Sequence, residues 1–592
     1  MQIQQFKKKY HINALLNIAK IVIIAYSGLY LLGNFVPYYQ GADSYLYGLE
    51  AINLSQGKFE ITNELFEETG NSIFLSGNWI RTIHNTAIPI GGIGLPIIGM
   101  IFYSIGGYFG LFYLAPIFGI ILLIVSERVA SKLFGKYVGF LALLFVATNH
   151  IVFRNSINLQ TESVFSVFFI LGVYWFILFF REGKERHLLF VSICFMISTF
   201  IRINGAIYLP IEIILVVTFF GLHYYKQRKQ SVDQKSNLVG QKYYNLTKKR
   251  ALRITSAILI PWIVFFVFWF SFYDYYFDDP FTNYRIADES AYEPISHRDS
   301  NPKAIVSLQP KNFENMKQYG KYLLPYQFTA VYNKSSQNYD QFFGLHWVGI
   351  IPFILIFMIL ITSIIFKKNR IEAFVFISLI LATLWFYSAT TTEERASFGV
   401  PGRYMVPAFI LVYMLYANLI KEMLMVKSPN KKSEKRYLVS GGKILLMTIL
   451  ILFFSGAFYF YPPTEAIKNM EFQFKNPQQF ADRYPLDPEG LTENSIIVAL
   501  HGDWAVDYGV IPFKLKRSED IPIQDIDLLK DKINSGYDAF VFKEPTYYKE
   551  KEALRNLIAN HGIVLKEYSS TFCKIELIEN KNGLSESDMN CL

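Results

Sequence analysis

The amino-acid sequence predicts a polytopic α-helical membrane protein of about eleven transmembrane helices that ends in a small extracytoplasmic α/β domain. Of the 592 residues, 52% are hydrophobic and 17% are aromatic, more than a soluble chain of this length carries. Apolar runs of about 20 residues, the length that crosses a bilayer, recur along the first three-quarters of the chain. Lysine and arginine cluster between these runs, so the formal net charge of +9 indicates membrane orientation and does not suggest a nucleic-acid partner.

The first apolar run, residues 18–37, follows Lys7, Lys8 and Lys9. It is long enough to span, and no small-residue cleavage site follows it, so we expect an uncleaved first helix with a cytoplasmic N-terminus. The segment that follows, residues 38–87, contains Asp43 and several glutamates but few basic residues. This composition places it outside the cytoplasm.

The next apolar run, residues 88–104, decides the topology. It contains Pro89 and Pro96 and has six glycines up to Gly107, which favours a broken or interfacial helix over a crossing one. If it does not cross, all later basic connections face the cytoplasm; if it crosses, they all face out, opposite the N-terminal lysines. We therefore expect the run not to cross and the C-terminus to lie outside. The further spans then fall at residues 108–127, 138–153, 163–180, 188–202, 204–222, 253–273, 346–366, 371–391, 402–420 and 443–461.

These spans divide the chain into a membrane domain, residues 1–461, and a soluble domain, residues 462–592. A second long polar loop outside the membrane covers residues 274–345. In the soluble domain, short apolar runs predict strands that alternate with helices, which indicates a small α/β fold. The predicted strands are residues 495–500, 539–542, 563–568 and 573–578, and the predicted helices are 526–534 and 547–561. The three cysteines, Cys194, Cys573 and Cys591, make no disulfide framework and no metal-binding spacing.

Several charged residues are predicted to meet at the outer membrane face, although different spans contribute them. They are Asp43 after the first span, Arg81 and His84 before the broken run, Arg154 and Glu162 between two spans, Arg202 at a span end, and Arg403 with Tyr404 at a span start. Any single arginine here could simply reach the lipid headgroups. Glu162 is more informative, because a short carboxylate gains nothing from anionic headgroups and is costly at the hydrocarbon edge unless paired or solvated.

Two carboxylates and several arginines at one face suit displacement at an anomeric carbon with a lipid phosphate as the leaving group. Arginines would neutralise the departing phosphate, and one carboxylate would take the proton from the attacking hydroxyl. The second carboxylate would orient the acceptor, hold the sugar or help bind a divalent cation. No His, Asp or Glu spacing demands a metal, so a divalent cation stays an open alternative.

Five segments in a fixed order support a family resemblance. They are Asp43 in the first outer loop, His84 through Pro96 ending in Tyr103–Gly106, Ser126–Gly135, Asn155–Glu162 and Arg403–Pro407. Over residues 15–420 the chain resembles the GT-C class of membrane glycosyltransferases. Within that class it is similar to the protein O-mannosyltransferase and lipid A aminoarabinose transferase group, including the Rgt-like relatives of prokaryotes.

This resemblance implies an inverting transferase that moves a sugar from a polyprenyl- or dolichyl-phosphate donor to an extracytoplasmic glycan, lipid or protein. It implies Asp43 as the base and Glu162 as a second acid. The implied donor-phosphate ligands are Arg81, His84, Arg154, Arg202, Arg403 and Tyr404. The chain departs from the family in its lone Asp43, in Glu162 where many relatives have Asp, and in His84 where Lys is common.

Two other classes of protein remain as alternatives. A transporter or flippase for a lipid-linked or polar solute would place its ionisable groups near the membrane midplane and not at one face. A non-catalytic scaffold would not need Asp43 and Glu162 to share a site. No internal repeat supports a secondary transporter.

Overall fold

The computed structural model describes helices, a two-stranded sheet and a five-stranded mixed sheet. The described residues are 2–35, 42–60, 64–69, 80–83, 86–89, 92–233, 247–277, 369–390, 400–425, 494–499, 511–514, 523–542, 563–567 and 572–577, with single residues between 312 and 359. The chain forms two compact units. The helical unit comprises Met1–Phe35 and Tyr113–Met470, and the sheet unit comprises Val36–Phe112 and Glu471–Leu592.

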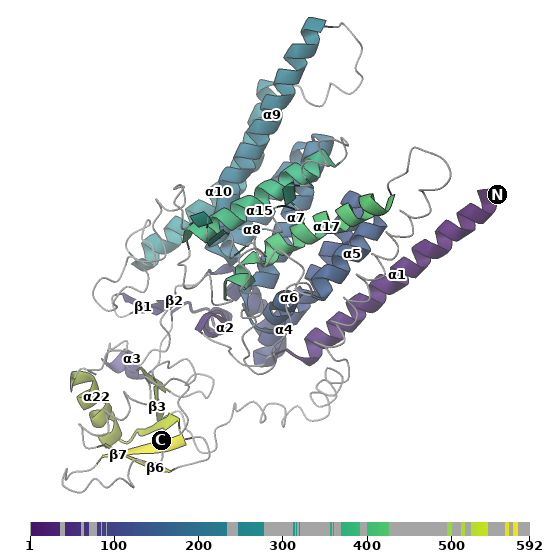
Figure 1. The fold of residues 1–592 in the computed structure, drawn as a ribbon. Coiled ribbons are helices and arrows are strands. Elements are labelled where there is room, and N and C mark those ends of the chain that lie inside the picture. Colours follow the sequence, from purple (N-terminus) through teal and green to yellow (C-terminus); the bar gives the residue numbers. More distant parts are fainter. Residues whose placement is uncertain are drawn as a thin grey trace. The chain divides into compact units, whose positions relative to one another are not determined.

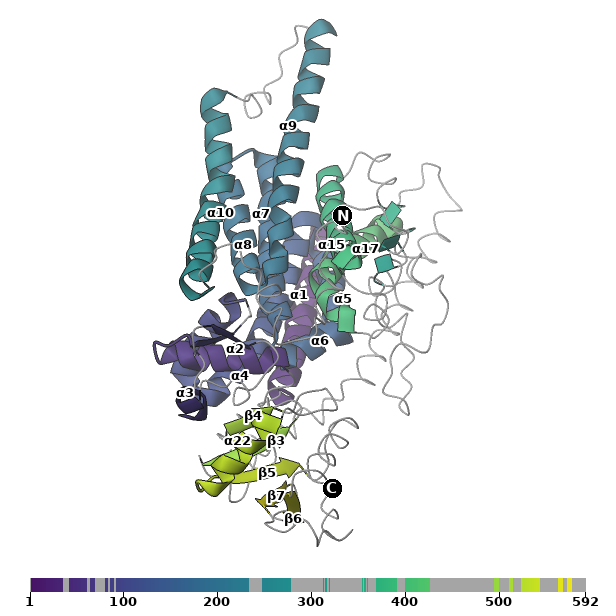
Figure 2. The same ribbon diagram turned by 90° about the vertical axis from the view of Figure 1, so that its left-hand side faces the viewer.

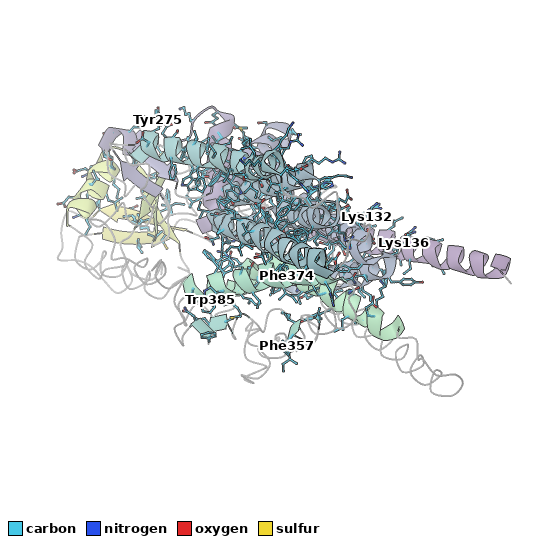
Figure 3. All side chains as sticks on the ribbon, turned by 90° about the horizontal axis from the view of Figure 1, so that it is seen from above. Lys132, Lys136, Tyr275, Phe357, Phe374 and Trp385 are labelled. Carbon is cyan, nitrogen blue, oxygen red and sulfur yellow. The ribbon has the colours of Figure 1, made fainter. Side chains whose placement is uncertain are left out.

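The helical unit is a bundle of apolar helices (Figure 1). Its described elements are α1 (Gln2–Gly33), the later part of α4 (Gly94–Phe134), α5 (Lys136–Ala147), α6 (His150–Ile157), α7 (Thr161–Glu182), α8 (Glu185–Ile201), η2 (Ile203–Ile207), α9 (Tyr208–Asp233), α10 (Lys248–Phe277), α15 (Arg370–Thr390), η6 (Val400–Met405) and α17 (Val406–Met425). Helix α7 packs against α8, α15 and α17, while α5 packs against α1 and α17. Helices α10 and α15 expose large apolar side chains such as Tyr275 and Phe374 (Figure 3), as lipid-facing helices do.

The helices confirm a polytopic membrane protein. Within the described residues, seven helices are long and apolar enough to cross a bilayer, and α5 with α6 forms a bent pair, turned by 67°, that passes the same test together. Helix α8, which corresponds to the predicted span at 188–202, is slightly shorter than these helices, with 17 residues, and packs along α7. The predicted spans from 18–37 to 253–273, and those at 371–391 and 402–420, coincide with helices. The predicted span at 443–461 and most of that at 346–366 lie outside the described residues. Of the loop at 274–345, only its first four residues and single residues between 312 and 319 are described.

The broken apolar run is confirmed as an interrupted helix. Its first residues belong to strand β2 (Thr86–Pro89), which pairs antiparallel with β1 (Ile80–Ile83). Helix α4 then starts at Gly94 and loses helical geometry at Gly106 and Gly107. Gly107 has φ 60° and ψ −150°, a backbone conformation that side chains other than glycine rarely tolerate. The helical part after this break, residues 108–134, is about 40 Å long, enough for one crossing.

A buried ion pair joins α1 to α4 inside the bundle. Lys20 on α1 bonds the carboxylate of Glu127 on α4, and the Ser131 hydroxyl donates to the same carboxylate at 2.6 Å. Side chains of Lys20 and Glu127 are less than a tenth exposed. Glu127 belongs to one of the segments that carry the family resemblance, and its contacts here are structural.

Basic side chains cap several helix ends at one end of the helical unit, which we call the basic end. Lys421 on α17 donates to the Phe134 carbonyl at 2.6 Å, and Arg250 on α10 donates to the Gly183 carbonyl at 2.6 Å. Lysine and arginine are suited to this task, because the last carbonyls of a helix lack intrahelical donors and carry partial negative charge. Lys132 and Lys136 lie at the same end, on either side of Gly135 (Figure 3). The clustering agrees with the predicted sidedness of the basic connections.

Arg181, on α7, joins three helices at the basic end. Its Nε donates to Glu372 Oε1 on α15 at 2.6 Å, and its Nη2 donates to the Leu133 carbonyl at 3.2 Å. The Glu372 side chain is 4% exposed, so Arg181→Met would leave a buried carboxylate without its cation. We expect unfolding of the detergent-solubilised protein to show a loss of about 1–3 kcal/mol, the cost of leaving a buried polar group unsatisfied. The double variant Arg181→Met/Glu372→Gln should recover part of this loss, and equal loss in both would contradict the pairing.

The sheet unit contains a five-stranded mixed sheet (Figure 2). The strand order is β4 (Ile511–Lys514), β3 (Ser495–Ala499), β5 (Asp538–Phe542), β7 (Phe572–Leu577), β6 (Ile563–Glu567). Strand β3 is parallel to β4 and β5, whereas β7 is antiparallel to β5 and β6. Helix α22 (Ile523–Asn534) connects β4 to β5. The four predicted strands are confirmed to within one residue at each end, and the predicted helix at 547–561 lies outside the described residues.

The first outer segment contains two helices that the sequence analysis did not predict, α2 (Ala42–Ser55) and α3 (Glu64–Thr69). Leu65 on α3 is fully buried in the core of the sheet unit, together with residues of β3, β5 and α22. Glu68 on the same helix pairs with Lys532 Nζ on α22 at 2.5 Å. Residues 36–112 and 471–592 therefore form one compact unit, although they are separate in the predicted domain organisation.

The three cysteines suggested no disulfide framework, yet the structure contains a disulfide at Cys573. This residue lies on β7, is fully buried and is disulfide-bonded, whereas Cys194 on α8 is free. A single disulfide leaves no recognisable cysteine framework, so spacing alone could not reveal it. We expect alkylation of the denatured, non-reduced protein to label Cys194 and not Cys573, with Cys573 labelled only after reduction. Labelling of Cys573 before reduction would contradict the pairing.

Candidate functional site

The candidate site lies at the end of the helical unit opposite the basic end. Along α7, nineteen residues separate Glu162 from Arg181, which is about 28 Å at the helical rise of 1.5 Å per residue. This is close to the thickness of a bilayer's hydrocarbon core, about 30 Å. The two charged ends of the bundle therefore correspond to the two faces of a membrane, with the site at one of them.

A short connection between α6 and α7 positions the carboxylate. Asn149 caps α6 by accepting from the Val152 backbone N–H at 3.0 Å, and its amide donates to Tyr413 on α17. After α6 the chain is extended at Asn158 and Gln160, and α7 begins at Thr161. Glu162 is thus in the first turn of α7, where the helix dipole favours a negative charge.

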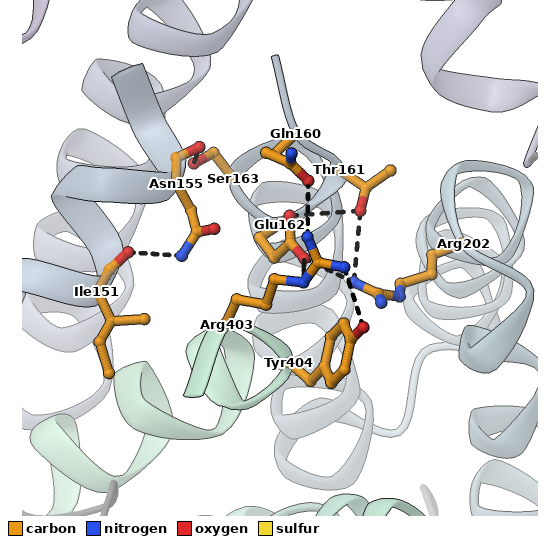
Figure 4. A network of polar contacts seen from close by, with 9 residues as sticks. All are labelled: Ile151, Asn155, Gln160, Thr161, Glu162, Ser163, Arg202, Arg403 and Tyr404. Atoms are coloured by element: carbon orange, nitrogen blue, oxygen red, sulfur yellow. Dashed lines mark hydrogen bonds and ion pairs between the residues drawn. The ribbon is translucent and has the colours of Figure 1, made fainter. Parts of the chain in front are cut away.

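Two arginines from other elements converge on Glu162 (Figure 4). Arg202 Nη1 donates to Glu162 Oε1 at 2.8 Å, and Arg403 Nε lies 3.5 Å from the same oxygen. The side chain of Glu162 is 2% exposed, whereas those of Arg202 and Arg403 are 18% and 23% exposed. The carboxylate is therefore enclosed, and the guanidiniums form the accessible part of the cluster.

Polar and aromatic neighbours hold the arginines in place. Gln160 Oε1 accepts from Arg403 Nη1 at 3.2 Å, and Thr161 Oγ1 accepts from Arg202 Nη1 at 3.4 Å. The guanidinium carbon of Arg202 is 4.2 Å from the ring centroid of Tyr404, a cation–π distance. On α15, the Tyr387 ring stacks on Tyr404 with centroids 5.3 Å apart and planes 10° from parallel.

Arg202 is held in position because the backbone of η2 lies close to helix α8. The residue joins α8 to η2 in an extended conformation. Gly205 in η2 lies so near α8 that a Cβ atom there would be 2.9 Å from Thr199 Oγ1 and 3.0 Å from Thr199 Cα. Only glycine fits at this point without moving η2 and the arginine before it.

The cluster of Arg202, Arg403 and Glu162 has a net positive charge, and Arg202 has N–H groups that can still donate hydrogen bonds. Two guanidiniums face one carboxylate, so the sum of the three charges is +1. Within the part of the chain that the structure describes, Nε and Nη2 of Arg202 have no hydrogen-bond partner. Such a guanidinium edge can bind an oxyanion through two parallel hydrogen bonds.

The structure brings together Glu162, Arg202, Arg403 and Tyr404 of the residues predicted from sequence. Arg154 has an exposed side chain on α6, and among the described residues no hydrogen bond or ion pair joins it to these four. Asp43 lies in the first turn of α2 and Arg81 on β1, both in the sheet unit, with side chains that the structure does not describe. His84 is outside the described residues.

Three site residues were not predicted. Gln160 and Thr161 belong to a segment that the sequence analysis singled out, and their position directly before Glu162 could have identified them. Tyr387 lies in an aromatic, apolar span and has no distinguishing signal. Among the described residues, no group of three or more His, Cys, Asp or Glu side chains could hold a metal ion.

The bundle and its charged end define a polytopic membrane protein with a cluster of two arginines and one glutamate at one end of its helices. No protein-family model and no curated protein sequence matches the chain. The crystal structure of ArnT from Cupriavidus metallidurans bound to undecaprenyl phosphate is similar, with a TM-score of 0.50 and 11% identity over 97% of this chain and 99% of that one. The apo oligosaccharyltransferase of Archaeoglobus fulgidus has a TM-score of 0.44 and 11% identity over 95% of this chain and 74% of that one. The chain has the GT-C fold, as its sequence predicts.

Proposed function

We propose that the protein is a membrane glycosyltransferase that moves a sugar from a polyprenyl- or dolichyl-phosphate donor to an extracytoplasmic glycan, lipid or protein, with inversion at the anomeric carbon. The observation that carries this proposal is the convergence of Arg202 and Arg403 at one membrane face of a GT-C fold. The undecaprenyl phosphate bound in the ArnT structure supports a lipid phosphate as the donor group.

In this reaction the two arginines bind the donor phosphate. The acceptor hydroxyl attacks the anomeric carbon on the side opposite the phosphate, and the bond from that carbon to the phosphate oxygen breaks. The leaving lipid phosphate gains one negative charge, which the guanidiniums stabilise by charge-assisted hydrogen bonds. Asp43 takes the proton of the acceptor hydroxyl.

The proposed orientation places the site and the sheet unit outside the cytoplasm, in the plasma membrane. The basic end of the bundle then faces the cytoplasm, in agreement with the positive-inside rule. The Cys573 disulfide supports the same orientation, because disulfides persist in oxidising compartments and are rare in the cytosol. The C-terminal domain would contribute to acceptor binding.

The decisive experiment measures release of polyprenyl phosphate by the purified protein in nanodiscs, from a panel of polyprenyl-phosphate sugars with candidate acceptors. Release that depends on the acceptor would establish the transferase. Movement of intact donor between leaflets of proteoliposomes, without release, would favour the transporter alternative. Failure of the protein to bind undecaprenyl phosphate would overturn the proposed phosphate site.

A further inference from the structure

Glu162 is poorly placed to act as a proton acceptor. Both of its carboxylate oxygens have protein partners, since Oε1 accepts from Arg202 and lies beside Arg403, while Oε2 is 3.5 Å from Thr161 Oγ1. Its side chain is 2% exposed. A general base must come within hydrogen-bond reach of the proton it removes. The surroundings of Glu162 suit contact with the two arginines and not with a substrate hydroxyl.

Glu162 lowers the net positive charge that the two arginines present to a bound phosphate. With the carboxylate present, the charges of Arg202, Arg403 and Glu162 sum to +1, and without it the sum would be +2. A phosphodiester donor carries one negative charge, whereas a phosphomonoester product carries about 1.5 to 2 near neutral pH, since its second pKa is about 6. The bare pair of arginines would therefore hold the product more strongly than the donor.

We infer that Glu162 is a positioning and charge-balancing residue that fixes Arg202 and Arg403 and weakens their hold on the lipid phosphate product, so that the product can leave. The inference rests on the proposed phosphate site and assigns Glu162 a role other than that of a second catalytic acid. Enclosure of the carboxylate behind two partly exposed guanidiniums is the observation that carries it.

The test uses Glu162→Gln, which has nearly the same shape as glutamate, keeps an oxygen acceptor for Arg202 and removes the charge. Binding of undecaprenyl phosphate to the full-length protein in nanodiscs would be measured at about pH 5 and about pH 8. At the lower pH the extra positive charge acts on a monoanion, and we expect affinity to rise about tenfold over wild type. At the higher pH it acts on a dianion, and the gain should approach about a hundredfold, with slower dissociation.

Two further variants separate charge from structure. Glu162→Asp keeps the carboxylate, so its affinity for undecaprenyl phosphate should remain near that of wild type at both pH values. Glu372→Gln removes another buried carboxylate that is paired with an arginine, fifteen residues along α15 from Tyr387 or about 22 Å, and should leave phosphate affinity unchanged. A thermal-unfolding measurement on each variant confirms that the fold is retained.

The outcomes distinguish this inference from the proposed function. Wild type that fails to bind undecaprenyl phosphate would overturn the phosphate site itself. Wild type that binds, with Glu162→Gln binding no more tightly or gaining equally at both pH values, would overturn the role of Glu162 alone. A larger gain at the higher pH in Glu162→Gln, absent from Glu162→Asp and Glu372→Gln, would establish it.

Discussion

Replacing Asp43 with asparagine is expected to lower the rate of sugar transfer by about 10²–10⁴-fold while donor binding is retained. Asparagine has almost the same shape but cannot accept the proton of the attacking hydroxyl at neutral pH. Asp43 lies in the first turn of α2, where the sequence Gly41-Ala42-Asp43-Ser44 starts the helix. Aspartate and asparagine are comparably tolerated at helix starts, so the fold should survive the change.

The measurement is release of polyprenyl phosphate, compared with undecaprenyl phosphate binding by the same preparation. Glu67→Gln is a suitable control, because Glu67 is an exposed carboxylate on α3 in the same outer segment. It should transfer sugar at close to the wild-type rate. Wild-type turnover in Asp43→Asn would show that another group acts as the base.

Replacing Arg202 with methionine is expected to lower kcat/KM by about 10²–10³-fold and to weaken undecaprenyl phosphate binding. Methionine retains much of the apolar length of the side chain and removes the charged fork. The conservative variant Arg202→Lys should retain only part of the wild-type activity. An ammonium group cannot donate two parallel hydrogen bonds to one phosphate while it is stacked on Tyr404.

Arg154→Met provides the matched control, because Arg154 is also a basic residue at this end of the bundle but is exposed, and among the described residues no hydrogen bond or ion pair joins it to Glu162. It should bind undecaprenyl phosphate as wild type does. A loss in Arg154→Met as large as that in Arg202→Met would mean that general positive charge at the membrane face, and not the Glu162 cluster, attracts the phosphate.

Hydropathy and local periodicity were sufficient to predict the elements that depend on residues adjacent in sequence. These elements are the membrane-spanning helices α1, α4 to α10, α15 and α17, the break at Gly106 and Gly107, and the ends of β3, β5, β6 and β7. Strand β4 was missed because Pro512 interrupts its pattern, which an edge strand tolerates. Helices α2 and α3 were missed because their segment was interpreted by its charge and not by its periodicity.

The charged residues at the centre of the site were predictable, but their polar and aromatic partners and their connections were not. Membrane topology alone places Glu162, Arg202 and Arg403 at one face. The partners Gln160 and Arg403 are 243 residues apart, however, and no local pattern relates them. The stacking of Tyr387 on Tyr404 and the enclosure of Glu162 are likewise tertiary properties, which depend on how α15, η6 and α7 pack.

Helix α3 has a consequence for biosynthesis. Its Glu68 and the Lys532 with which it pairs are separated by 464 residues. At a synthesis rate of about 5–20 residues per second, α3 leaves the ribosome roughly 20–90 s before its partner does. During this interval Leu65 cannot be buried in the core that it later shares with β3, β5 and α22. A quality-control protease or chaperone that recognises exposed apolar side chains such as Leu65 would therefore have its clearest opportunity in this interval. A premature stop codon before Lys532 would make the exposure permanent.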